Sequence, residues 1–114
     1  MAKTIALTYE GKNYTLEFTR ETVKQMERRG FKLTDVVDAP LTYAPELFAG
    51  AFKANYPRLD RGFINEMFYS IPDVRGLINA LSEMYNEPIL TLLDGASEDD
   101  EGKASWAADW SRTN

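Results

Sequence analysis

The sequence predicts an α+β domain in which an N-terminal β-hairpin packs on a bundle of four to five helices. Near the N-terminus, apolar and polar residues alternate on both sides of a glycine turn. The segments that follow repeat apolar residues at spacings of three and four, as amphipathic helices do. A chain of 114 residues, of which 44% are hydrophobic, is long enough for one domain with a real core. We therefore expect one domain over residues 1–94 and a flexible acidic tail over residues 95–114.

The hairpin is predicted from a two-residue period that the turn at residues 10–13 interrupts. The apolar residues on its shared face are Ile5, Leu7, Tyr9, Tyr14, Leu16 and Phe18. An isolated hairpin is only marginally stable in water. Helices of this chain, or strands of another chain, must therefore cover that face.

Helix signals follow the hairpin directly. Thr19 is suited to cap a helix over about residues 20–29, and Gly30 is suited to end it. Residues 34–40 form a connection to which no structure is assigned, with Val36 and Val37 as expected anchors in the core.

Pro57, Pro72 and Pro88 divide the remainder into helices. One helix is predicted over about residues 41–55, with Pro45 in its first turn, and a second begins at Asp60 and ends before Pro72. The longest helix starts near Val74. Pro88 is expected to break or kink it, which leaves a last short helix that closes at residues 94–95.

Most catalytic chemistry is excluded by composition. The chain has no cysteine and no histidine, and it contains no phosphate-binding or nucleophile-elbow motif. Asp35 and Asp38 are the closest candidate acid/base pair, but loop aspartates ordinarily make turn and cap hydrogen bonds. The acidic run that starts at Ser97 faintly resembles a calcium loop, yet its twelfth position is Ala108 where a bidentate glutamate belongs. We therefore expect that the protein is not an enzyme and that it binds no cofactor and no metal ion.

The charge distribution argues against nucleic acid as a partner. The formal net charge is −5, and residues 94–114 contribute −4 of it through six acidic and two basic residues. The remaining −1 on residues 1–93 offers no Lys/Arg surplus for phosphates. The same distribution argues against a protein that mimics nucleic acid, because the acidic charge is confined to the tail and does not cover a folded face. No apolar run approaches the roughly 18 residues needed to span a bilayer, so we expect no membrane association and a cytoplasmic location.

Two groups of residues are candidates for binding partners. Phe48, Gly50 and Phe52 share a predicted helix, where glycine is unfavourable unless another backbone approaches closely or the monomer packs tightly there. Trp106 and Trp110 are four residues apart in the polar tail, a spacing typical of a short motif that docks in a groove. The alternative is that the tail folds back and both tryptophan rings cover the domain.

Several segments resemble a family of small prophage proteins of unknown function from Gram-positive bacteria. The matching stretches lie at residues 3–12, 14–20, 22–27, 30–31, 47–52 and 83–88. In layout the family is similar to the tail assembly chaperones of long-tailed phages, which are small, acidic and mostly helical. This resemblance implies a non-enzymatic protein of the bacterial host cytoplasm.

The resemblance also implies partners. A phage tail assembly chaperone coats the tape-measure protein, helps to recruit tail tube subunits and self-associates as a homo-oligomer. Many weak contacts along one long client fit that role. The alternative is a structural phage component, such as a head–tail connector or a tail-completion protein, which is equally small and equally free of catalytic motifs.

Overall fold

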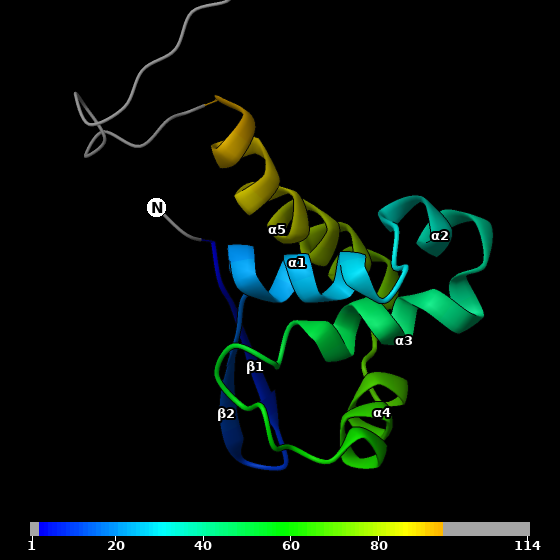
Figure 1. The fold of residues 1–114 in the computed structure, drawn as a ribbon. Coiled ribbons are helices and arrows are strands. Elements are labelled where there is room, and N and C mark those ends of the chain that lie inside the picture. Colours follow the sequence, from blue (N-terminus) through cyan, green and yellow to red (C-terminus); the bar gives the residue numbers. More distant parts are fainter. Residues whose placement is uncertain (1–2, 95–114) are drawn as a thin grey trace, which may run out of the picture.

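The computed structural model of the chain describes residues 3–94 (Figure 1). In this range a two-stranded antiparallel hairpin precedes five helices, which confirms the predicted α+β fold. In chain order the elements are β1 (Ile5–Tyr9), β2 (Lys12–Leu16), α1 (Arg20–Arg28), α2 (Leu33–Asp38), α3 (Pro40–Gly50), α4 (Arg61–Tyr69) and α5 (Val74–Asp94). The predicted tail lies outside the described residues.

The hairpin has the register that its alternating pattern requires. Tyr9 pairs with Lys12, so Glu10 and Gly11 form a two-residue turn. Both turn residues have positive φ angles, 51° and 81°, as a type I′ turn demands. All six apolar residues of the predicted face belong to the core or pack against it.

The outer edge of β2 is closed by the segment between α3 and α4. The N–H of Thr15 donates to the hydroxyl of Tyr56 at 2.9 Å, and its carbonyl accepts from Asn55 Nδ2 at 3.0 Å. Just beyond the strand, the N–H of Glu17 donates to the carbonyl of Ala51 at 3.1 Å. Figure 1 shows this connection passing beside β2. The outward-facing backbone groups of Thr15 are therefore satisfied within the chain.

Helix α1 begins and ends at the predicted signals. The Thr19 hydroxyl accepts from the N–H of Thr22, and the Thr22 hydroxyl accepts from the N–H of Thr19, which makes a reciprocal capping box. Gly30 has a φ of 91°, a conformation that stops a helix at little cost only for glycine.

The segment predicted as an unassigned connection contains a short helix, α2. Val36 is buried, whereas the neighbouring Val37 is 80% exposed, so the prediction that both valines anchor the chain is wrong. A helix turns by about 100° per residue, and in α2 this rotation carries the side chain of Val37 from the core to the solvent.

Helix α3 is shifted relative to the prediction. It starts with Pro40 at its first position and ends at Gly50, and Pro45 lies inside the helix instead of in its first turn. Pro40 suits the start because the first N–H groups of a helix have no partner within it. Residues 51–55 continue as turns, in which the N–H groups of Phe52 and Lys53 bond three residues back.

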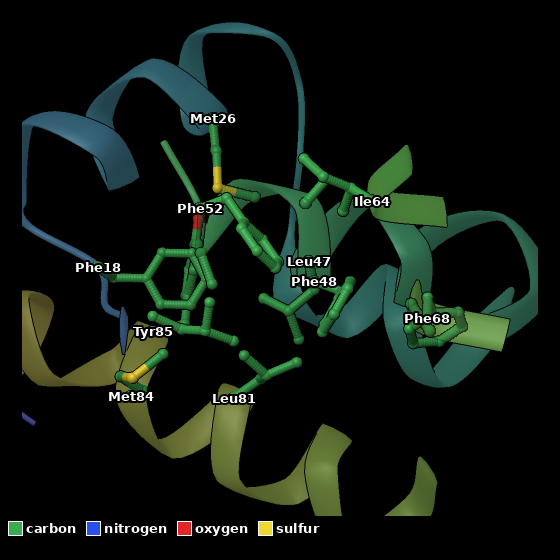
Figure 2. Close-up of a cluster of buried hydrophobic side chains, with 14 of the residues drawn as sticks. Phe18, Met26, Leu47, Phe48, Phe52, Ile64, Phe68, Leu81, Met84 and Tyr85 are labelled. Carbon is green, nitrogen blue, oxygen red and sulfur yellow. The ribbon is translucent and has the colours of Figure 1, made fainter. Parts of the chain in front are cut away.

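Helix α3 is the centre of the core. It packs against α1, α2, α4 and α5, and the side chains of Leu47, Phe48 and Phe52 are fully buried. Figure 2 shows these side chains surrounded by residues from the other elements, among them Phe18 and Leu81.

Helix α5 runs unbroken from Val74 to Asp94, so the predicted separate last helix is wrong. Pro88 lies inside α5 and is buried. Proline removes only one hydrogen bond of the ladder directly, and the hydroxyl of Thr91 donates to the carbonyl of Glu87 at 2.8 Å beside it. Past the proline, Ile89 still packs against the core, whereas Leu90, Leu92 and Leu93 are exposed.

Candidate partner-binding groove

The described surface contains an apolar groove where α2, α3, α4 and α5 meet. We call it the α2–α5 groove, and its volume is about 230 Å³. Its lining comprises Val36, Pro40, Leu41, Ala44, Pro45, Phe68, Tyr69, Val74 and Ile78. None of these residues is charged, so an occupant of the groove is recognised by shape and by the burial of apolar surface.

The groove has a buried floor and an exposed rim. Val36 and Phe68 on the floor are almost completely buried. Leu41 and Tyr69 on the rim are 92% and 72% exposed. The Tyr69 ring makes an edge contact with Phe68, with ring centroids 5.5 Å apart, which orients it beside the floor.

Helix ends place the rim residues. Leu41 is the second residue of α3, and Tyr69 is the last residue of α4. Both positions lie where a helix meets a connection, away from the central packing of α3. Burying an exposed leucine side chain stabilises a protein or a complex by roughly 1.5–3 kcal/mol. The described chain does not bury Leu41, so a partner that covers it would gain this free energy.

A second groove lies between α1 and the C-terminal half of α5. Its volume is about 360 Å³, and its apolar residues include Val23 and Ile89. Four charged residues also line it, namely Arg20, Glu21, Lys24 and Glu27. This groove is larger, but its charged residues make it less suited to an apolar partner than the α2–α5 groove.

The described residues form no cluster of the kind that holds a metal ion. Residues 3–94 hold no group of three or more carboxylates that could bind a metal ion. Asp35 and Asp38, expected in a loop, lie on α2. Burial, and then the negative charge of Glu27, raise the pKa of the Tyr85 phenol to about 12. This phenol therefore stays neutral at physiological pH.

Phe48 and Phe52 are core residues and not a docking surface. Both side chains are fully buried, and their rings contact each other with centroids 5.1 Å apart. Phe48 also packs on Phe68 at 5.3 Å. A partner could reach these rings only by opening the domain, so their prediction as partner-binding residues is corrected.

Gly50 is explained by tight packing within the monomer. A Cβ atom at this position would lie 2.5 Å from Met26 Sδ and 2.7 Å from Met26 Cε. The Met26 side chain of α1 thus occupies the space beside α3 that any larger residue would need. Close approach is the correct reason for the glycine, but the approaching group belongs to this chain. Trp106 and Trp110 lie outside the described residues.

Leu41 and Tyr69 are the exposed residues that the sequence did not single out. Leu41 follows a proline and precedes the main apolar stripe of α3, and Tyr69 adjoins the stripe of α4. For Tyr69 a signal was present, because it lies off the repeat of α4 formed by Ile64, Met67 and Phe68. Leu41 gave no such signal, because it lies three and four residues before the buried Ala44 and Pro45 and so continues the repeat of α3. Only the fold exposes Leu41 and brings these two residues to one groove.

Fold and surface together define a small α+β protein whose described part has an uncharged apolar groove. The chain belongs to the family described as Domain of unknown function (DUF5055), whose family model matches residues 1–110. The match thus extends past α5 and includes both tryptophans. No curated protein and no solved structure matches the chain. In the range 3–94, no helix is both long enough and apolar enough to cross a membrane.

Proposed function

We propose that this protein is a phage tail assembly chaperone that holds apolar helical segments of the tape-measure protein. The observation that carries the proposal is the uncharged α2–α5 groove with Leu41 and Tyr69 exposed on its rim. The resemblance to small prophage proteins supplies the identity of the client. The groove supplies a means of holding it.

The shape of the groove suits one face of an amphipathic helix. Helices that dock in grooves insert apolar side chains spaced three, four and seven residues apart. A groove of about 230 Å³ accepts a few such side chains and not a whole protein surface. Each contact is therefore modest, and strong coating of a client requires many copies along its length.

Moderate affinity is what a tail chaperone needs. A tape-measure protein is a long helical chain whose apolar surface aggregates when it is left uncovered. Tube subunits must then displace the chaperone copies one at a time. In this proposal the acidic residues 98–101 keep the coated client soluble, and Trp106 and Trp110 recruit the tail tube protein.

Co-expression with the tape-measure protein of the same genome tests the proposal. We expect the tape-measure protein to stay in the soluble fraction with the parent chain and to pellet with the variant Leu41→Glu. The variant Leu90→Glu is the matched control, because Leu90 is also an exposed helical leucine but lines neither groove. Equal solubility with and without the parent chain would refute the proposal.

The composition of virions separates this function from the structural alternative. A chaperone leaves before the tail is complete, so we expect mass spectrometry to find the protein in lysates and not in purified particles. A stoichiometric amount in particles would establish a connector or tail-completion protein instead. A gene position directly before the tape-measure gene would favour the chaperone.

A further inference from the structure

The outer edge of strand β1 is open. β1 pairs with β2 on one side, and no other strand belongs to the sheet in the described chain. Within residues 3–94, no backbone or side-chain hydrogen bond reaches the main chain of Ala6 or Thr8 from outside the hairpin. Both residues are exposed. This contrasts with Thr15 on the outer edge of β2, whose main chain is paired with Asn55 and Tyr56.

The register shows which backbone groups the open edge presents. Thr15 directs its N–H and carbonyl away from β1, because both bond to the α3–α4 connection. Thr15 is paired with Ala6 of β1, and the two residues share no main-chain hydrogen bond because Thr15 bonds elsewhere. The main-chain N–H and carbonyl of Ala6 therefore also point away from the partner strand, toward the open edge. The same alternation turns the main chain of Thr8 outward. Two donors and two acceptors therefore line this edge.

The edge has none of the features that prevent strands from pairing. The sequence of β1 is Ile-Ala-Leu-Thr-Tyr, without proline and without charge. Its apolar face is also incompletely covered. Ile5 and Leu7 are half-buried, whereas the residues paired with them in β2, Leu16 and Tyr14, are buried.

We propose that two copies of this chain pair through the outer edges of their β1 strands, antiparallel and centred on Leu7. This register places Ala6 of each copy opposite Thr8 of the other and forms four main-chain hydrogen bonds in a four-stranded sheet. The two Leu7 side chains meet on the half-covered face. Registers centred on Ala6 or on Thr8 would pair fewer of the five residues of β1, because Leu7 is the middle residue of the strand.

Charge at the two ends of β1 favours a second copy running antiparallel. Lys3 precedes the strand and Glu10 follows it. Antiparallel pairing brings Lys3 of one copy to the same end of the paired strands as Glu10 of the other. The two-fold symmetry of the dimer gives one such pair of opposite charges at each end. Parallel pairing would place like charges together. The surface involved contains no residue of the α2–α5 groove, so the inference stands independently of the proposed client.

Charged residues introduced at positions 6 and 8 test the pairing. We expect sedimentation of the full chain to show a dimer for the parent. The variant Ala6→Lys/Thr8→Lys and the variant Ala6→Glu/Thr8→Glu should each be at least tenfold weaker in self-association, because like charges then face each other across the strands. An equimolar mixture of the two should form the heterodimer.

The mixed variant Ala6→Lys/Thr8→Glu distinguishes the register. It should stay dimeric, because the register centred on Leu7 places Lys opposite Glu at both pairs. Circular dichroism verifies that each variant is folded. Slow hydrogen exchange at the amides of Ala6 and Thr8 in the parent dimer should disappear in the two like-charge variants.

Three outcomes would overturn the inference. They are a parent chain that stays monomeric, a dimer that both like-charge variants leave unchanged, and fast exchange of the two amides in the parent dimer. The variant Leu41→Glu should dimerise like the parent, which separates this test from the test of the client groove.

Discussion

At the scale of single residues, Gly50 and Met26 are coupled through the space that they share. The variant Gly50→Ala places a methyl group where Met26 Sδ lies, so the buried methionine must move. Overpacking costs roughly 1–3 kcal/mol, and the better helix propensity of alanine offsets up to about 1 kcal/mol. We expect a net loss of about 1 kcal/mol in the free energy of unfolding, measured in urea.

A double-mutant cycle isolates that coupling. In a Met26→Ala background the obstructing sulfur is absent, so Gly50→Ala should be neutral or stabilising there. Equal costs in both backgrounds would show that Met26 is not the reason for the glycine.

Tyr85 gives the protein an alkaline stability limit. Its pKa is about 12 in the folded chain, against about 10 for an ordinary tyrosine. Between these values the unfolded chain releases a proton that the folded chain retains, so stability falls as the pH rises from 10 to 12. Below pH 10 the contribution is constant.

The variant Tyr85→Phe lacks this titration. We expect its urea midpoint to fall less steeply than that of the parent between pH 10 and 12. Parallel slopes for parent and variant would contradict the assignment of the raised pKa to burial of Tyr85.

At the scale of elements, the helix caps make separable contributions. Replacing Thr19 by alanine removes the hydroxyl that accepts from the N–H of Thr22. We expect a loss of about 1 kcal/mol in the free energy of unfolding. The conservative variant Thr19→Ser keeps the acceptor and should lose less than half as much. A Thr19→Ala variant as stable as the parent would show that the capping box contributes nothing.

Local sequence signals predicted where an element begins or ends when a single local physical effect determines that boundary. The turn at Gly11, the cap at Thr19 and the stop at Gly30 were all readable, because each depends on a few adjacent residues. Pro88 was misread because its local cost is outweighed by the packing of α5 on the core, in which Pro88 itself is buried. The helix at 33–38 was missed because six residues give too short a repeat.

The candidate groove was less predictable than the fold. Phe48 and Phe52 fall on the apolar stripe of their helix, and such a stripe belongs first to the core. Leu41 and Tyr69 lie 28 positions apart in the sequence. Their proximity arises from the packing of α3, α4 and α5, which no local pattern encodes.

At the scale of the whole molecule, the family match to residues 1–110 includes Trp106 and Trp110. We predict that changing both to alanine leaves the melting temperature within a few degrees of the parent but weakens capture of tail tube or tape-measure protein. An aromatic hot spot supplies roughly one to several kcal/mol of binding. A large drop in melting temperature, with blue-shifted tryptophan fluorescence in the parent, would establish that the rings cover the domain instead.

The most direct test of the central claim is the affinity of a purified helical tape-measure segment for the full-length chain, measured by titration calorimetry. Burial of Leu41 at the contact predicts at least a tenfold loss of affinity for Leu41→Glu, about 1.4 kcal/mol or more. The matched control Leu90→Glu should bind within about twofold of the parent. If Leu41→Glu binds as tightly as the parent, the α2–α5 groove does not hold the client.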